Sequence, residues 1–154
     1  MTGQLKTLLD NCRQHVRYLS AAAGRLPERV GAPDIAARDD SLVAVLDQFA
    51  YRFVRLQDTM GGRVFRRLLI EHFGEPYEDS SLRDVIDRLE KLEILPSADR
   101  WSEIRAMRNT LAHDYPETSE EKAAAIELAR EMAREMAAIL DRIESAISPR
   151  SSGG

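Results

Sequence analysis

One run of apolar residues, between Leu42 and Leu68, constrains the fold more than any other feature of the sequence. Its members are Leu42, Val45, Leu46, Phe49, Phe53, Leu56, Met60, Val64 and Leu68. They recur every three or four positions, which is the spacing of one face of an α-helix. A helix over residues 42–73 would be about 48 Å long. Gly61-Gly62 interrupts the run, and each glycine costs about 1 kcal/mol against alanine inside a helix, so we expect a kink or a close helix crossing there.

Four further segments show helical spacing of apolar residues, over 4–23, 82–94, 98–113 and 119–147. The segment 24–39 between the first two helices contains two glycines and two prolines and is predicted to be a connecting loop. Helix starts are indicated by residues that cap helix N-termini, and stops by glycine and proline. The starts are Asp39-Asp40-Ser41, Ser80 or Ser81, Ser97 and Thr118 with Glu121, and the stops are Gly24, Gly74 and Pro96.

These segments predict an all-α fold, an antiparallel bundle of about five helices in a single domain over residues 1–147. Residues 148–154 have the composition of a flexible tail. Hydrophobic residues make up 44% of the chain and charged residues 31%, which is enough to build a core. A transmembrane run and a signal peptide are both missing from the sequence, so we expect no membrane association and a cytoplasmic location. A single cysteine, Cys12, excludes an internal disulfide.

The net charge of −4 counts against a general nucleic-acid-binding surface, although it leaves room for a local basic patch. Such a patch is indicated by arginines at 52, 55, 63, 66 and 67 against the single acid Asp58. Two interpretations stay open. The row of all five arginines could form a wall that guides RNA through phosphate contacts, with Arg52 and Arg55 as RNA-binding residues. The same face could equally be solvated, with local pairs such as Arg55 with Asp58.

Polar residues capable of chemistry gather on the segment 98–113. Trp101, Arg105, Asn109 and His113 are four positions apart and share one face of the predicted helix, and Arg108 lies about 100° to its side. A guanidinium stabilises phosphate charge, and an imidazole moves protons near neutral pH, so the face suits phosphate chemistry. The alternative is a helix C-terminus at which His113 and the arginines interact with the exposed carbonyls and the helix dipole. Pro116 disfavours helix at Tyr115, so the helix should end near His113.

The pattern Arg108-Asn109-x3-His113 resembles the Arg-x4-6-His motif of the HEPN superfamily, whose members are helical bundles and include many metal-independent endoribonucleases. With Tyr115 it is similar to the Arg-x4-His-x-Tyr form of HepT-like toxins. The resemblance extends over about residues 40–147 and includes the order of the helices.

The resemblance implies a homodimer in which the two motifs face each other and form one RNA-cleaving site, with the segments 42–73 and 98–113 near the interface. It implies His113 as general acid or base, Arg108 as the group that stabilises the phosphorane, and Asn109 as an orienting residue. RNA would be the substrate, with Arg105 among its contacts. No metal or other cofactor is needed in such a site.

The implied partner is a minimal nucleotidyltransferase (MNT) antitoxin, which in some systems transfers AMP to the tyrosine of the motif, here Tyr115. Tyr115 could instead be an aromatic residue packed at the junction of helix and loop. Two other functions remain possible for the whole chain. One is a non-catalytic HEPN subunit that binds substrate or docks for a nucleotidyltransferase, and the other is a purely structural bundle.

A metal site is not predicted. Cys12 and His15 are three positions apart, but no second pair of ligands accompanies them at a suitable spacing.

Overall fold

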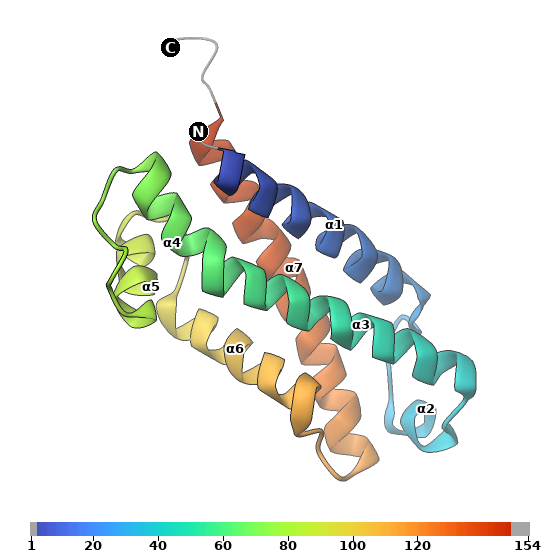
Figure 1. Cartoon of the computed structure of the whole chain (residues 1–154). Coiled ribbons are helices and arrows are strands. Elements are labelled where there is room, and N and C mark those ends of the chain that lie inside the picture. Colours follow the sequence, from blue (N-terminus) through green and yellow to red (C-terminus); the bar gives the residue numbers. More distant parts are fainter. Residues whose placement is uncertain (1–2, 149–154) are drawn as a thin grey trace.

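The computed structural model describes residues 3–148, and within them the chain forms helices and no strand. The predicted all-α fold is therefore confirmed (Figure 1). Its helices are α1 (Gly3–Arg25), α2 (Ala32–Ala37), α3 (Asp40–Thr59), α4 (Phe65–Arg67), α5 (Leu82–Lys91), α6 (Ala98–His113) and α7 (Ser119–Ile147). Apart from Ser148, the predicted tail lies outside the described residues. None of the helices in this range combines the length and hydropathy that a bilayer-crossing segment requires.

A continuous helical rod from Asp40 to His72 forms the centre of the fold, as predicted for residues 42–73. It begins at Asp39, whose carboxylate accepts a hydrogen bond of 3.2 Å from the backbone N–H of Leu42. It consists of α3, a π-helical segment Met60–Val64, α4, and a second π-helical segment Leu68–His72. The chain leaves it at Gly74, whose positive φ of 67° favours glycine.

Gly61 allows a second helix to pass close to the rod. A Cβ atom at this position would lie 3.2 Å from Cζ2 of Trp101 in α6 and 3.1 Å from Nε2 of Gln57. Nothing lies within 4 Å of the same atom placed on Gly62. The expected close helix crossing is thus confirmed, and the rod continues through the glycine pair as a π-helical turn.

The other long helices pack around the rod in an antiparallel arrangement. α1 lies along α3 on one side and α6 on the other, and α7 passes behind all three (Figure 1). The buried faces meet in one core that includes Phe53, Leu56, Trp101, Ile104 and Met136. Ser97 caps the N-terminus of α6 and Thr118 caps that of α7, and their side-chain oxygens accept backbone N–H hydrogen bonds of 3.0 and 3.1 Å. Both starts were predicted from the sequence.

Two boundaries differ from the prediction. The segment 24–39 is not all loop, because it contains α2, which packs on α7. Just before α2, the backbone N–H of Val30 donates a hydrogen bond of 2.8 Å to the carboxylate of Glu127 in α7. The helix expected over 82–94 ends at Lys91, since the chain turns at Glu93 with a φ of 61°. The first apolar residues of α3 are also only half-buried, because this end of the rod faces the short α2.

Candidate functional site

The last two turns of α6 present the predicted motif at the surface. The helix ends at His113, as expected, and the backbone N–H of Asp114 closes the last turn on the carbonyl of Thr110 at 3.0 Å. Arg105, Asn109 and His113 are all exposed. Because they are four positions apart, they lie on one face of the helix. A cation, an amide and an imidazole are therefore accessible together.

Trp101 does not belong to this exposed face, although the spacing placed it there. Its side chain is 1% exposed and packs edge-on against Phe65, with ring centroids 4.7 Å apart. The first half of α6 packs against both the rod and α7, so its buried face includes Trp101 as well as the apolar stripe. The indole fills the space left open by Gly61.

Arg108 is held against the rod by Asp58 of α3. Its Nε and one terminal nitrogen each donate a hydrogen bond of 2.8 Å to the two carboxylate oxygens. These hydrogen bonds raise the pKa of the guanidinium above its ordinary value. The pairing of Arg55 with Asp58 considered from the sequence is therefore wrong, since α6 supplies the arginine that Asp58 binds.

Arg108 and His113 leave the helix in different directions. Five positions on an α-helix correspond to about 140° around the axis and about 7.5 Å along it. Arg108 is directed towards α3 by its hydrogen bonds with Asp58, whereas His113 lies at the exposed C-terminal end of α6. One protomer therefore presents the two groups in diverging directions and does not enclose a substrate between them.

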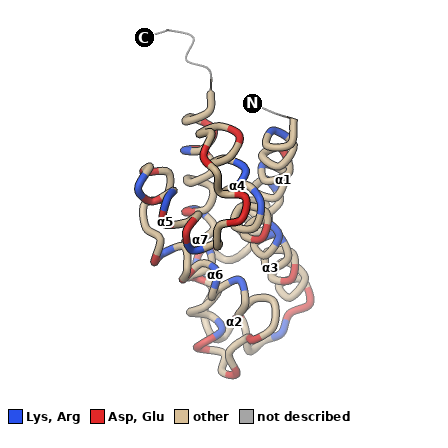
Figure 2. The backbone as a smooth tube through the Cα atoms, turned by 60° about the vertical axis from the view of Figure 1, so that its left-hand side comes forward, with Lys and Arg blue, Asp and Glu red and all other residues tan. Residues whose placement is uncertain are grey.

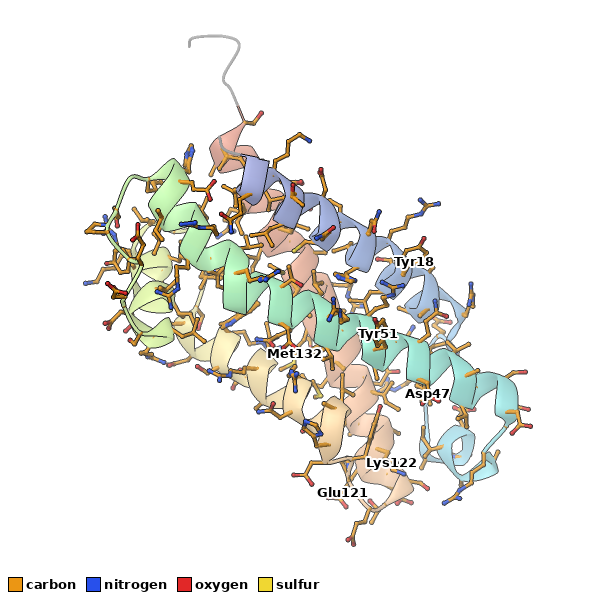
Figure 3. All side chains as sticks on the ribbon, viewed as in Figure 1. Tyr18, Asp47, Tyr51, Glu121, Lys122 and Met132 are labelled. Atoms are coloured by element: carbon orange, nitrogen blue, oxygen red, sulfur yellow. The ribbon has the colours of Figure 1, made fainter. Side chains whose placement is uncertain are left out.

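Tyr115 lies beside the motif in a pocket of about 570 Å³ formed by α2, the first half of α3 and the start of α7. Its residue surface is 38% exposed. Burial, and then the carboxylate of Asp47, raise the pKa of its hydroxyl. Lys122 Nζ lies 5.9 Å from the ring centroid. Figure 3 marks Asp47 on α3 and Lys122 near the start of α7, the two long helices that flank the pocket.

The predicted arginine row does not form a continuous wall. Arg66 donates to the backbone carbonyls of Tyr77 and Ser80, and Arg67 pairs with Glu71, so both stabilise the fold. Arg55 is exposed. Arg52 turns towards α1, where its Nη1 lies 3.1 Å from Nδ1 of His15. Acidic and basic positions are otherwise interspersed along most of the helices (Figure 2), in keeping with the acidic net charge.

His15 and Cys12 have structural surroundings. Both are buried, and the pKa of His15 is lowered, first by burial and then by the neighbouring Arg52 and Arg55. Burial raises the pKa of the Cys12 thiol to about 12. Residues 3–148 contain no cluster of three or more His, Cys, Asp or Glu side chains arranged to hold a metal ion.

One residue near these groups was given the wrong role from the sequence, and two were missed. Asp58 was assigned to the wrong arginine, although it is the one acid within the arginine-rich stretch 52–67. Tyr18 and Tyr51 are exposed by 40% and 57% and both lie against Arg52, with ring centroids 4.5 and 5.3 Å from its Cζ. Tyr18 follows Arg17 and Tyr51 precedes Arg52 in the sequence, and this pairing of an aromatic residue with an arginine is the signal that could have identified them.

Comparison with known proteins connects this fold with one solved structure. Neither the models of known protein families nor the sequences of curated proteins yield a match. In structure, the chain is similar to the tri-AMPylated HEPN toxin of Shewanella oneidensis, solved in complex with an MNT antitoxin. The TM-score is 0.57 at 15% sequence identity, and the match covers 94% of this chain and 99% of the other. The HEPN-like fold implied by the motif is thereby confirmed.

Proposed function

We propose that the chain is the toxin of a HEPN/MNT toxin–antitoxin pair and an endoribonuclease whose reaction needs no metal. The observation that carries this proposal is the exposed end of α6, where Arg108, Asn109 and His113 occur on a fold shared with a HEPN toxin. The spacing to Tyr115 completes the motif of HepT-like toxins. The fold match and the motif are independent, because the fold comparison does not depend on these four residues.

In the proposed reaction the ribose 2′-hydroxyl attacks the adjacent phosphorus. His113 takes the proton of that hydroxyl or gives a proton to the departing 5′-oxygen. Arg108 stabilises the negative charge on the phosphorane, and Asn109 orients the phosphate. The bond to the 5′-oxygen breaks, which leaves a 2′,3′-cyclic phosphate on one product and a 5′-hydroxyl on the other. Asp58 acts as a positioning residue, because it fixes the planar guanidinium of Arg108.

A homodimer suits this site because the groups diverge on one protomer. Arg108 and His113 are separated by about 140° around α6, so a phosphate between them would be half open to solvent. A second copy that faces the first would enclose it and contribute its own arginine and imidazole. Arg105, which is exposed on the same face as His113, would contact the RNA backbone, and Arg55 and Arg52 would extend that contact along α3.

The proposed antitoxin regulates the site through Tyr115. The Tyr115 hydroxyl oxygen would attack the α-phosphorus of ATP bound to the MNT partner, with release of pyrophosphate and transfer of the phenolic proton to a base of the partner. The base is required because burial and Asp47 disfavour the phenolate. The product carries a negative phosphodiester near Arg108 and His113, which repels RNA.

A non-catalytic docking subunit is the second candidate. It is favoured by the net charge of −4 and by the carboxylate of Asp58, which already forms hydrogen bonds with Arg108. Growth measurements distinguish the two. Expression of the wild-type chain without a partner should arrest growth and fragment cellular RNA, whereas the His113→Ala chain at equal abundance should do neither. Equal growth and intact RNA in both cultures would discard the toxin and leave the docking subunit.

A further inference from the structure

We infer that Tyr18 and Tyr51, joined by Arg52, form a stacking platform for the bases of single-stranded RNA next to the proposed cleavage site. This inference rests on the proposed function and specifies its substrate as unpaired RNA. In the following, the platform means Tyr18 and Tyr51 with the three arginines around them, Arg17, Arg52 and Arg55.

The two rings belong to neighbouring helices and are fixed by one cation. Tyr18 lies on α1 and Tyr51 on α3, and Figure 3 shows both on the same side of the molecule. Cζ of Arg52 is 4.5 Å from the ring centroid of Tyr18 and 5.3 Å from that of Tyr51. Cation–π contacts of this kind hold aromatic side chains in place. With 40% and 57% of their surface exposed, both tyrosines keep ring surface available to solvent.

The surroundings of the platform are basic in an acidic protein. Residues 11–25 and 48–57 contain five arginines and no aspartate or glutamate; of the five, Arg13 is paired with Asp141 and Glu144 of α7, and the nearest acid along α3 is Asp47, one turn before Tyr51. Several arginines elsewhere are paired with carboxylates, as in Arg100 with Glu135 and Arg88 with Glu75, although others, such as Arg63 and Arg105, form no such pair within the described residues. Within residues 3–148, no ion pair forms at Arg17, Arg52 or Arg55, so the three arginines nearest the rings all lack a carboxylate partner.

Arg52 in particular lacks the partners expected of a half-buried arginine. Its Nε is buried without a hydrogen-bond partner, and Nη1 faces the ring nitrogen of His15. The pKa of His15 is lowered in part by Arg52 and Arg55, as expected where positive charge is not balanced. A phosphate provides the missing negative charge, and exposed rings beside it offer a surface for bases.

The platform lies within reach of the motif along one helix. Tyr51 and Asp58, which holds Arg108, are seven positions apart on α3, or about 10 Å along its axis. Arg55 is exposed between them. A strand whose scissile phosphate lies at Arg108 therefore extends across Arg55 to the tyrosines within a few nucleotides. Only unpaired bases can stack on aromatic side chains, so the platform selects single strands over duplexes.

Binding of an uncleavable RNA tests the inference on the intact chain. An oligoadenylate with methylated 2′-hydroxyls cannot undergo the proposed reaction, so its affinity can be measured by fluorescence anisotropy with the wild-type protein. We expect tighter binding of this single strand than of the corresponding duplex. Tyr18→Ala and Tyr51→Ala should each weaken it on the order of tenfold, whereas Tyr18→Phe and Tyr51→Phe, which keep the ring, should bind like wild type.

Matched variants and parallel measurements separate the possible outcomes. Arg17→Gln should weaken binding, and Arg142→Gln, which removes an exposed arginine of α7 away from the platform, should not. Thermal unfolding verifies that the alanine variants are folded.

Unchanged RNA affinity in both alanine variants would overturn the platform. It would also be overturned if the alanine variants kept their RNA affinity but changed in oligomeric state or in antitoxin binding. Cleavage of unmodified RNA is measured separately. If the wild type binds through its tyrosines but does not cleave, the proposed nuclease fails and the RNA-binding platform stands.

Discussion

Asp58 and Arg108 connect the two helices that carry the proposed RNA site, through two parallel hydrogen bonds of 2.8 Å each. Only a planar guanidinium can make this paired contact with a carboxylate. The side chain of Arg108 is 23% exposed, so the pair lies at the surface where a phosphate can approach it. The orientation of Arg108 therefore depends on α3 as well as on α6.

A double-mutant cycle tests this dependence. Arg108→Ala should lower the rate of RNA cleavage at saturating protein on the order of 10²-fold or more, because it removes charge stabilisation from the transition state. Asp58→Asn should lower it by about tenfold, because the guanidinium is less well placed. The double variant should be no slower than Arg108→Ala alone. The measurement is the single-turnover cleavage rate of each variant. If the loss in the double variant equalled the product of the two single losses, Asp58 would not act through Arg108.

The two adjacent glycines of the rod should respond in opposite ways to alanine. Gly62→Ala should stabilise the protein by about 0.5–1 kcal/mol, because its Cβ meets nothing and alanine favours a helix. Gly61→Ala should destabilise it by about 1–3 kcal/mol, because its Cβ presses on the buried ring of Trp101 at 3.2 Å. Urea unfolding of both variants measures the difference, and equal stability would contradict the close crossing of α3 and α6.

The hydroxyl of Tyr115 should titrate above the ordinary tyrosine pKa of 10.0, because burial and Asp47 both disfavour the phenolate. Difference absorbance between the wild type and Tyr115→Phe isolates this titration. Asp47→Asn should move the midpoint to lower pH without restoring the ordinary value, because burial is the larger cause. A midpoint that does not respond to Asp47→Asn would place the carboxylate too far from the hydroxyl to affect it.

Modification of Tyr115 makes a separate prediction. After incubation with an MNT partner and ATP, the mass of the intact wild-type chain should rise by whole AMP units. Tyr115→Phe lacks the nucleophile and should keep its mass. An unchanged wild-type mass would remove regulation by AMP transfer and leave the nuclease proposal untouched.

Cys12 makes stability depend on pH in the alkaline range. Its folded pKa of about 12 lies above the ordinary 9.0, so the unfolded chain loses the thiol proton first. The contribution to stability is therefore complete below pH 9.0 and declines as the pH rises towards 12. Relative to Cys12→Ala, the wild type should lose about 1.4 kcal/mol per pH unit in this range. A constant difference in unfolding free energy between the two chains would contradict the burial of the thiol.

The sequence predicted helix boundaries where capping chemistry is local. Ser97 and Thr118 start their helices as expected, and α6 ends at His113. The short α2 was missed although it has local start signals, namely Pro33 in its first turn and the Asp34 carboxylate, which accepts a hydrogen bond of 2.8 Å from the backbone N–H of Gly31. The glycines and prolines of the segment 24–39 predict a loop instead.

The candidate site was predictable only in part. Periodicity placed Arg105, Asn109 and His113 on one exposed face, and this prediction is confirmed. Periodicity also placed Trp101 on this face. That prediction was wrong, because α6 crosses α3 closely at Gly61 and the crossing buries the indole. The partner of Arg108 and the contact between Tyr18, Tyr51 and Arg52 join distant parts of the chain, so only the folded arrangement shows them.

The chemistry of the RNA ends produced by the purified chain tests the nuclease proposal most directly. Wild-type protein should cut single-stranded RNA in the presence of a metal chelator and leave 2′,3′-cyclic phosphate ends. His113→Ala should be slower by about 10²–10⁴-fold, the usual contribution of a general acid–base group. Intact RNA after incubation with folded wild-type protein, or equal cleavage by His113→Ala, would contradict the assignment of α6 as a ribonuclease site.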